Sequence, residues 1–353
     1  MQTELLVCDN PESKQKGVAR AAAVLRAGGL VALPTETVYG LGAIEGNKDA
    51  EARLRELKGR EGEKPFTVHI ADMETASRFV EFIPPLGRRL MRRCWPGPLT
   101  IVFENPGRRT VGLRLPSHEL ACDIIRKAGG AVLLPSANLS GEPPALNAQD
   151  VLRAFDGRID AVVDGGPATL GKSSTVIRLK GKTFEVLRPG AFSETLLRRA
   201  SNTVLLFVCS GNSCRSPMAE AMARRMLAER LNVPPEEIEE HGYAVMSGGV
   251  VGGFASPASG EAIEVMREMG VDISNHLSQT ITRQMVEHAD RVFVMTPDQM
   301  DQVLRIAPGA TGRVSLLDVK GRPVTDPHGG DREAYRRCAF IIRRALERRI
   351  KDL

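Results

Sequence analysis

A cysteine and an arginine stand six positions apart, directly after a buried apolar strand expected over Val204–Val208. The loop between them reads Cys209-Ser-Gly-Asn-Ser-Cys-Arg215 and continues into Ser216-Pro217, where a helix is expected to open. A tight loop before a helix turns backbone N–H groups toward one point, and the helix dipole adds positive potential. Such a cradle lowers the pKa of a thiol, so Cys209 is expected to attack phosphorus as a thiolate. Arg215 would hold two phosphoryl oxygens through the transition state.

Basic side chains in the first half could bind anions such as phosphates and carboxylates. The candidates are Lys58, Arg60, Arg114 and Arg188. Arginine suits the planar carboxylate and the bidentate phosphate, whereas lysine acts as a movable point charge. Each of them alone is also compatible with a solvated surface charge, and His69 is compatible with a packed, hydrogen-bonded histidine.

One sequence pattern occurs twice in the first half. Gly28-Gly-Leu-Val-Ala-Leu-Pro-Thr35 matches Gly129-Gly-Ala-Val-Leu-Leu-Pro-Ser136. Each copy contains a glycine turn, a buried strand, a proline that stops sheet pairing and a hydroxyl residue. If the two strands end at the same edge of a sheet, Thr35 and Ser136 lie on one rim, where α/β sheets bind ligands. The alternative is two unrelated buried strands that end in turns.

Several further motifs accompany this repeat. In chain order they are Pro34-Thr-Glu-Thr-Val-Tyr-Gly40, Lys58-Gly-Arg60, Lys64-Pro-Phe-Thr-Val-His69, Trp95-Pro-Gly-Pro-Leu-Thr100, Arg114-Leu-Pro116, Ser136-Ala-Asn138-Leu-Ser-Gly141, Ser173-Ser-Thr-Val176 and Leu187-Arg-Pro-Gly190. In this order the set resembles the threonylcarbamoyl-AMP synthase family over the whole first half. The resemblance implies condensation of L-threonine, bicarbonate and ATP to threonylcarbamoyl-AMP and pyrophosphate. The product would pass to a tRNA-modifying threonylcarbamoyl transferase that forms threonylcarbamoyladenosine.

The resemblance also implies which residues contact the substrates. Those expected at the amino acid are Thr35, His69, Arg114, Ser136 and Ser174, and those expected at the nucleotide are Lys58, Arg60, Thr110, Asn138 and Arg188. Magnesium would arrive with ATP as substrate, so no protein metal site is expected. An RNA-binding module is the alternative, although the low aromatic content, 4% of the chain, leaves little material for base stacking.

The second half, from about Val204 to the C-terminus, resembles the low-molecular-weight protein tyrosine phosphatase family. Asp326 in Val324-Thr-Asp326-Pro327 would then be the general acid that protonates the leaving group. The phosphate loop would comprise Ser210, Gly211, Asn212, Ser213, Cys214 and Ser216, with the Ser216 hydroxyl bonded to the nucleophilic sulfur. Asn212, Ser247 and His276 match residues that brace the loop.

Two departures from the tyrosine phosphatase pattern affect the expected substrate. His328-Gly-Gly330 follows Asp326-Pro327 where aromatic residues usually stand, and Ser213 replaces a branched apolar residue. Both resemble the bacterial branch that includes protein-arginine phosphatases, so phosphotyrosine and phosphoarginine stay open.

Arsenate reduction needs further redox cysteines, and after Cys214 only Cys338 remains. A domain that binds phosphate without turnover is the non-enzymatic alternative. Cys214 could also form a reversible disulfide with Cys209.

The elements that must position these residues are buried strands alternating with amphipathic helices. Strands are expected at Leu30–Leu33, Leu99–Phe103, Ala131–Leu134, Ala161–Val163, Val204–Val208 and Val292–Met295, and helices at Val18–Ala27 and Met218–Leu227. This alternation predicts an α/β fold. With the two resemblances, it predicts a YrdC-like twisted mixed sheet over residues 1–200 and a phosphatase-type parallel sheet flanked by helices over residues 203–353.

Length and composition agree with two folded domains. A chain of 353 residues is too long for a single hydrophobic core. Its content of 42% hydrophobic and 26% charged residues is ordinary for globular proteins. The net charge of +5 fits anionic substrates but equally fits a solvated surface. No apolar run reaches the length of a membrane span or signal peptide, and the six cysteines are scattered, so we expect a cytoplasmic protein with reduced thiols.

Overall fold

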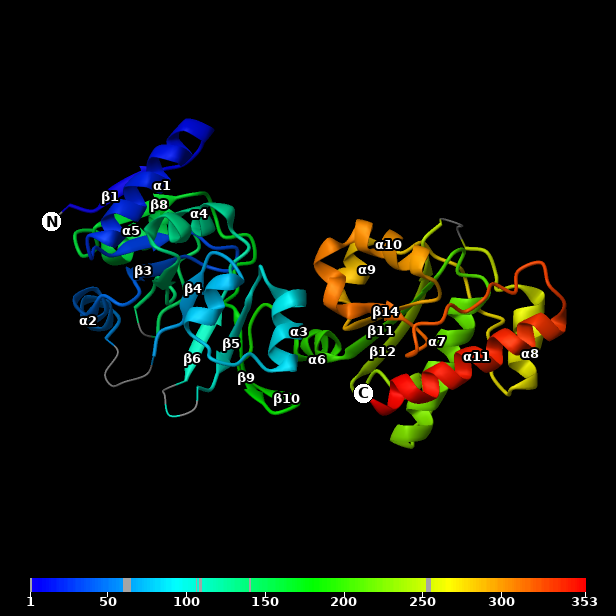
Figure 1. The fold of residues 1–353 in the computed structure, drawn as a ribbon. Coiled ribbons are helices and arrows are strands. Elements are labelled where there is room, and N and C mark those ends of the chain that lie inside the picture. The colour runs from blue at the N-terminus through cyan, green and yellow to red at the C-terminus, as the bar shows by residue number, and fades with distance from the viewer. Residues whose placement is uncertain (1, 60–64, 106, 108–109, 140, 252–254) are drawn as a thin grey trace. The chain divides into compact units, whose positions relative to one another are not determined.

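The chain folds into two compact units, Met1–Ala200 and Ser201–Leu353, in a computed structural model (Figure 1). The structure describes residues 2–59, 65–105, 107, 110–139, 141–251 and 255–353. Arg60 therefore lies outside the described residues.

The described strands of the first unit form one mixed sheet in the order β1-β8-β2-β3-β7-β4-β6-β5-β9-β10. Their bounds are β1 Glu4–Val7, β2 Val31–Leu33, β3 Gly40–Ile44, β4 Val68–Ile70, β5 Leu99–Phe103, β6 Val111–Arg114, β7 Ala131–Leu133, β8 Ala161–Asp164, β9 Thr175–Lys180 and β10 Thr183–Arg188. The sheet contains both parallel pairs, such as β4 with β6, and antiparallel pairs, such as β4 with β7. The predicted mixed sheet is confirmed.

The helices of the first unit pack against this sheet through two hydrophobic clusters. The helices are α1 Pro11–Arg26, α2 Lys48–Leu57, α3 Pro85–Cys94, α4 Glu119–Ala128, α5 Ala148–Phe155 and α6 Glu194–Ser201, with a 3₁₀ turn η1 at Glu74–Arg78. Leu25 of α1 and Ile124 of α4 belong to one cluster, whereas Leu54 of α2, Leu90 of α3 and Phe155 of α5 belong to the other. Alternate residues of the strands supply both clusters, as expected for strands buried on both faces.

The repeated pattern brings two strand ends to one edge of the sheet. β2 and β7 both pair antiparallel with β3, which lies between them. The two strands therefore run in the same direction, and the residues that follow them emerge at the same edge. Ser136 also forms a bridge with Gly40, the first residue of β3.

The described strands of the second unit form a wholly parallel sheet in the order β12-β11-β13-β14. They are β11 Thr203–Cys209, β12 Tyr243–Gly249, β13 Arg291–Val294 and β14 Val314–Leu316; the helices are α7 Arg215–Leu231, α8 Gly260–Glu268, α9 Arg283–His288, α10 Pro297–Ile306 and α11 Arg332–Lys351, with 3₁₀ turns η2 at Pro235–Glu237 and η3 at Pro308–Arg313. The predicted parallel sheet flanked by helices is confirmed.

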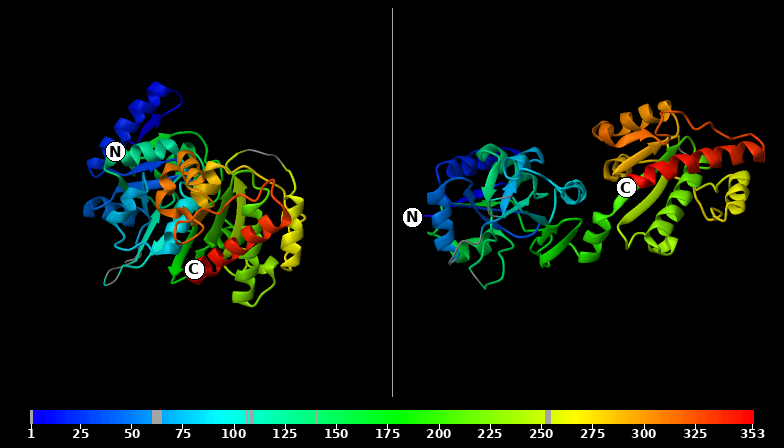
Figure 2. Two further views of the ribbon diagram at one scale, coloured as in Figure 1. Left: turned by 45° about the vertical axis from the view of Figure 1, so that its right-hand side comes forward. Right: turned by 60° about the horizontal axis from the view of Figure 1, so that its bottom comes forward.

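Residues of β11 alternate between two cores. Leu205 and Phe207 join the cluster that contains residues of α7, α8 and α11, whereas Leu206 and Val208 join the cluster that contains Val286 of α9 and Val303 of α10. The red α11 and the yellow-green α7 lie side by side on the face of the sheet to which Leu205 and Phe207 point (Figures 1 and 2).

One predicted element start is wrong by two residues. The helix after the phosphate loop begins at Arg215 with Cys214 as its N-cap residue, so Pro217 occupies the third helical position. This is compatible with proline because the first four N–H groups of a helix have no intrahelical partner.

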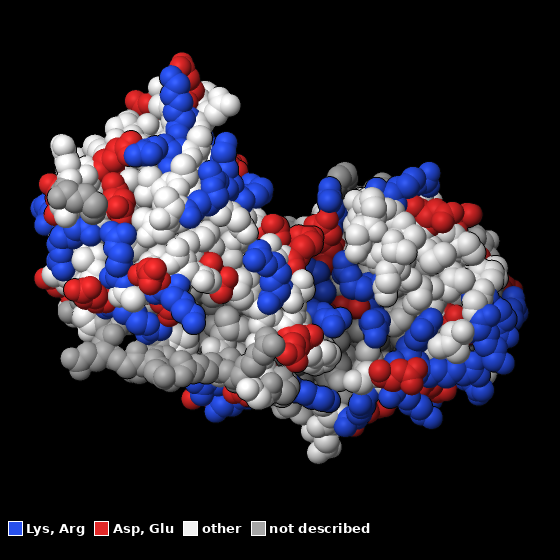
Figure 3. Space-filling view, turned by 60° about the vertical axis from the view of Figure 1, so that its left-hand side comes forward, with Lys and Arg blue, Asp and Glu red and all other residues white. Residues whose placement is uncertain are grey.

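The surface charge is mixed on the face shown in Figure 3, where Lys and Arg side chains are interspersed with Asp and Glu. Among the described helices, none combines the length and the apolar character that crossing a membrane requires.

Candidate active sites

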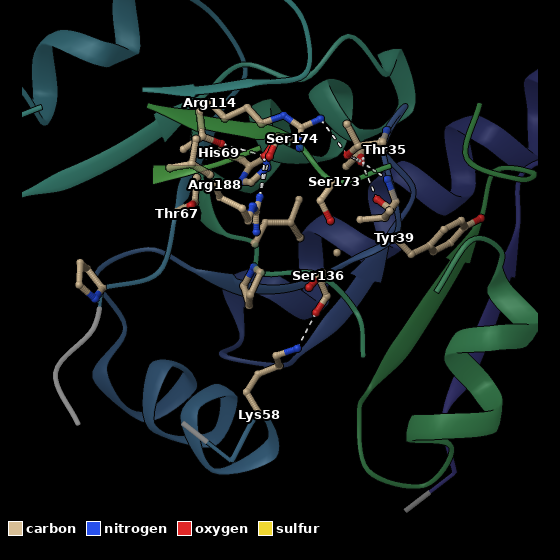
Figure 4. Close-up of a pocket in the computed structure, with 18 residues that line it drawn as sticks. Thr35, Tyr39, Lys58, Thr67, His69, Arg114, Ser136, Ser173, Ser174 and Arg188 are labelled. Carbon is tan, nitrogen blue, oxygen red and sulfur yellow. Dashed lines mark hydrogen bonds between the residues drawn. The ribbon is translucent and has the colours of Figure 1, made fainter. Parts of the chain in front are cut away.

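A pocket of about 220 Å³ opens at the sheet edge of the first unit (Figure 4). Seven of the ten predicted substrate-binding residues line it: Thr35, Lys58, His69, Arg114, Ser136, Ser174 and Arg188. They come from segments that are far apart in the sequence, and both copies of the repeat contribute to one wall. Lys58, Arg114 and Arg188 give the pocket positive charge, so its chemistry suits anions.

Arg114, the last residue of β6, forms a buried ion pair that sequence reasoning missed. Its Nη2 donates to Glu36 Oε1 at 2.6 Å and to Thr37 Oγ1 at 3.0 Å. The Arg114 and Glu36 side chains are only 5% and 9% exposed. Glu36 Oε2 also accepts a bond from the Ser117 backbone N–H at 3.2 Å. Glu36 thus holds the guanidinium group at one orientation beside the pocket.

His69 of β4 is an uncharged histidine at the pocket wall. It pairs with Arg114 in the parallel β4–β6 register and is 3% exposed. Burial, together with the nearby Arg114 charge, holds the pKa of His69 well below its usual value. Within the described part of the chain, its buried Nδ1 has no hydrogen-bond partner. An unsatisfied buried nitrogen in a pocket wall suits a polar ligand.

Lys58, at the end of α2, holds the loop that follows β7. Its Nζ donates to the Ser136 carbonyl at 2.8 Å, to the Asn138 carbonyl, and to Asn138 Oδ1 at 3.4 Å. Ser136 Oγ donates to the same Asn138 Oδ1 at 2.6 Å. Asn138 lies beside the pocket rather than in its lining. The Lys58 ammonium group and the Ser136 hydroxyl therefore meet at one corner of the site, as Figure 4 shows.

Arg188 forms the opposite wall with Ser174. Its Nη2 donates to the Ser174 carbonyl at 2.9 Å and to Ser174 Oγ at 3.1 Å. Ser174 Oγ also lies 3.0 Å from Thr100 Oγ1. Gly190 makes this packing possible, because a Cβ there would lie 2.4 Å from the backbone atoms Ser174 C and Thr175 N.

Not all of the predicted residues line this pocket. Thr110 precedes β6 and is not among the described residues of the lining, and Arg60 lies outside the described residues. The lining also includes hydroxyl residues that sequence reasoning passed over, at Thr37, Thr67, Thr100 and Ser173, and it includes Tyr39, whose own hydroxyl donates to the Gly166 carbonyl at 2.7 Å. All of them lie within the quoted motifs, which was the available signal.

The loop after β11 encloses the thiol of Cys209. The sulfur lies 3.0 Å from Ser216 Oγ and accepts a bond from the Asn212 backbone N–H at 3.3 Å. Asn212 adopts a left-handed conformation with φ of 55°, which asparagine tolerates better than most residues. The Ser216 hydroxyl and the Asn212 N–H therefore both contact the sulfur.

Side chains from neighbouring loops hold Asn212 in place. Its Nδ2 donates to Ser216 Oγ at 2.9 Å and to Ser247 Oγ at 2.8 Å, and its Oδ1 accepts from the Gln279 N–H at 2.9 Å. His276 Nε2 lies 2.8 Å from the Asn212 carbonyl oxygen. The structure therefore brings together the three residues that the resemblance assigned to the loop.

Arg215 and Asp326 are paired at the mouth of the same loop. Arg215 Nη2 donates to Asp326 Oδ2, and Nη1 donates to the Val324 carbonyl at 3.2 Å. The Arg215 side chain is 4% exposed and the Asp326 side chain 44%. Arg215 Nε is buried without a partner among the described residues. A buried guanidinium edge beside a thiol suits a tetrahedral anion.

The other two thiols of this unit have separate surroundings. Cys214 Sγ donates to Ser259 Oγ at 3.3 Å and lies 3.5 Å from the Tyr335 hydroxyl. Burial raises the pKa of Cys338 to about 12, so this thiol stays protonated and a poor nucleophile. All three are free thiols in this structure, and a Cys209–Cys214 disulfide stays a prediction.

Comparison with known proteins shows what these sites resemble. Residues 23–190 match the Sua5/YciO/YrdC family model, described as telomere recombination. A threonylcarbamoyl-AMP synthase of Thiobacillus denitrificans is 38% identical over 186 residues, covering 50% of this chain and 97% of the relative. The chain belongs to the threonylcarbamoyl-AMP synthase family. Its counterpart in Bacillus subtilis is 40% identical over 198 residues, or 53% of this chain and 57% of that protein.

The chain spans about half the length of the first curated relatives it matches, 57% for the Bacillus subtilis synthase and 53% for the Pyrococcus abyssi synthase. Among solved structures, P. abyssi Sua5 complexed with L-threonine has a TM-score of 0.52 and 25% identity, covering 89% of this chain and 99% of that chain. Residues 204–353 match the low molecular weight phosphotyrosine protein phosphatase family model. The match to this second family model begins after the match to the first model ends.

Proposed function

We propose that the first unit condenses L-threonine, bicarbonate and ATP to threonylcarbamoyl-AMP and pyrophosphate. The observation that carries this proposal is the convergence of Lys58, Arg114 and Arg188 on one hydroxyl-lined pocket. All three substrates bring negative charge, and cations from separate elements can neutralise triphosphate, bicarbonate and carboxylate together. The solved L-threonine complex of the similar P. abyssi protein supports threonine as the amino acid.

The reaction needs positioning more than covalent catalysis. The threonine amine attacks bicarbonate and releases water to give a carbamate, whose oxygen then attacks the α-phosphorus of ATP and releases pyrophosphate. Because burial holds the pKa of His69 well below its usual value, His69 would add no positive charge to the pocket, and its Nδ1 would be available to a polar substrate group. Magnesium would arrive with ATP, and the lining has no Asp or Glu among the described residues.

The test is pyrophosphate release from ATP and bicarbonate, with and without L-threonine. We expect pyrophosphate release to require threonine. In Lys58→Ala it should fall at least about a hundred-fold, because the variant lacks a charge-assisted contact to the substrate and no longer holds the loop that follows β7. Binding of tRNA without threonine-dependent pyrophosphate release would instead support the RNA-binding alternative. The product is proposed to pass to a tRNA-modifying transferase in the cytoplasm.

We further propose that the second unit removes phosphate from a protein side chain through a cysteinyl-phosphate. The carrying observation is the Cys209 sulfur between Ser216 Oγ and the Asn212 N–H, beside the buried Arg215. The thiolate would attack phosphorus while Asp326 protonates the leaving group. Water would then hydrolyse the intermediate and release phosphate.

Phosphotyrosine is the proposed substrate, and phosphoarginine is the second candidate because Ser213 is small and polar. Ser213 is anchored through its carbonyl, which accepts the Ser259 N–H at 2.9 Å. Matched phosphotyrosine and phosphoarginine peptides, with Cys209→Ser as control, test both. Preference for phosphoarginine that is weakened by Ser213→Ile would establish the second candidate, and preference for phosphotyrosine would refute it.

A further inference from the structure

Gln299, near the start of α10, is a buried amide whose orientation is determined by its neighbours. It is 3% exposed, and its Oε1 accepts the backbone N–H groups of Met295 at 3.0 Å and Thr296 at 3.2 Å. These two donors require an oxygen at that end of the amide. The NH₂ group must therefore point the other way, where Nε2 lies 3.1 Å from Ser210 Oγ in the phosphate loop.

The Ser210 hydroxyl accepts two hydrogen bonds at once. Besides the amide of Gln299, Arg215 Nη2 donates to it at 3.2 Å. Amide NH₂ and guanidinium groups are donors only, so they occupy both lone pairs of the hydroxyl oxygen. The hydroxyl hydrogen is left to donate, and among the described residues it has no acceptor. Because Arg215 is expected to hold phosphoryl oxygens, a phosphoryl oxygen is the acceptor that this arrangement fits.

Gln299 also connects the loop to the segment that carries Asp326. Met295, whose N–H bonds to Gln299, accepts the Val324 N–H on its own carbonyl at 2.8 Å. The Val324 carbonyl in turn accepts from Arg215 Nη1 at 3.2 Å. One buried amide thus joins the end of β13, the phosphate loop and the Asp326 segment.

We propose that Gln299 is a positioning residue of the phosphatase site, which fixes the Ser210 hydroxyl as a hydrogen-bond donor to the bound phosphoryl group. The proposal rests on the phosphatase function proposed above. It does not depend on whether the leaving group is tyrosine or arginine, because the donor addresses the phosphoryl oxygens.

The test measures inhibition by orthovanadate, which mimics the phosphoryl group, in the full chain. Ser210→Ala removes the donor, and we expect its inhibition constant to rise about ten-fold or more. Gln299→Met replaces the amide by an apolar side chain of similar volume, and we expect its inhibition constant to rise as well. Since Gln299 acts through Ser210, the double variant should bind vanadate about as weakly as Ser210→Ala alone.

Two further variants separate this role from a structural one. Gln302→Met makes the same change on the same helix without contacting the loop and should bind vanadate like the wild type. Ser210→Thr keeps a hydroxyl and should bind more tightly than Ser210→Ala, a comparison that stands even if Gln299→Met fails to fold. Unchanged vanadate binding in Ser210→Ala would overturn the proposal. So would a double variant whose inhibition constant rises by the product of the two single-variant factors. A wild type without vanadate affinity or phosphatase activity would refute the phosphatase function instead.

Discussion

Glu36 and Arg114 are opposite charges that have been taken almost completely out of water. A pair of this kind contributes little net stability over an apolar pair, but removing one partner leaves a buried charge uncompensated. The pair lies 78 residues apart in the sequence and connects the Pro34–Gly40 motif to the end of β6. Its main consequence is the fixed position of a guanidinium group at the pocket wall.

Glu36→Gln is therefore expected to destabilise the first unit by about 3–5 kcal/mol and to abolish most synthase activity. Glu4→Gln is the matched control, because the Arg20–Glu4 pair is 57% and 40% exposed and should contribute less than about 1 kcal/mol. Urea unfolding and threonine-dependent pyrophosphate release measure the two effects. Equal losses of stability in the two variants would contradict the assignment.

His69 makes the stability of the first unit depend on pH. In the unfolded chain it titrates near pH 6.5, whereas burial and Arg114 hold its native pKa well below that. Below about pH 6.5 the unfolded state therefore binds a proton that the native state does not, and stability falls as the pH falls. We expect His69→Gln to remove up to about 1.4 kcal/mol per pH unit of this dependence.

Urea unfolding of the wild type and His69→Gln between pH 7.5 and pH 5 measures the difference. His118, whose pKa burial also lowers, remains in both proteins and its contribution cancels. Identical slopes of unfolding free energy against pH in the two proteins would show that His69 is not buried in its neutral form.

At the scale of elements, the pocket of the first unit depends on two backbone segments that approach each other closely. The segment after β10 lies against the residues before β9, where the Ala191 N–H donates to the Ser173 carbonyl at 2.9 Å. Gly190 is required at this crossing because the atoms that a Cβ would meet belong to the backbone and cannot rotate away.

Gly190→Ala should accordingly displace Ser174 and Arg188, lower synthase activity by more than about ten-fold and cost about 1–3 kcal/mol of stability. Gly112→Ala in β6 is the control, since its Cβ would meet its nearest neighbours, on Thr100 and Thr67, at an ordinary 3.6 Å. Activity assays and thermal unfolding of both variants decide the matter. A fully active Gly190→Ala protein would mean that this wall can shift without harm to the site.

At the scale of the whole molecule, the two units have separate cores and separate sites. We expect Cys209→Ser to abolish phosphatase activity and leave pyrophosphate release unchanged. Lys58→Ala combined with Arg60→Ala should have the opposite effect. Both activities are measured on each protein, and loss of both from either change would mean that the two units do not work independently.

Local patterns determined much of this protein. The alternation of buried strands and helices predicted an α/β fold, and the two resemblances predicted one mixed and one parallel sheet. The phosphate loop was predictable because its chemistry lies within seven consecutive residues, Cys209 to Arg215, whose turn and helix start are local properties. The repeat of strand, proline and hydroxyl residue likewise indicated that Thr35 and Ser136 belong at one sheet edge.

Only the tertiary structure decided which distant side chains meet. Glu36 pairs with Arg114, and Gln299 reaches Ser210 across 89 residues, because strand order and register bring those strand ends together. No local pattern specifies these pairs, because the two partners of each pair lie on or after different strands, and strand order decides which strand ends are neighbours. The sequence does not predict the close approach at Gly190 either, because that contact depends on where a second segment of backbone passes.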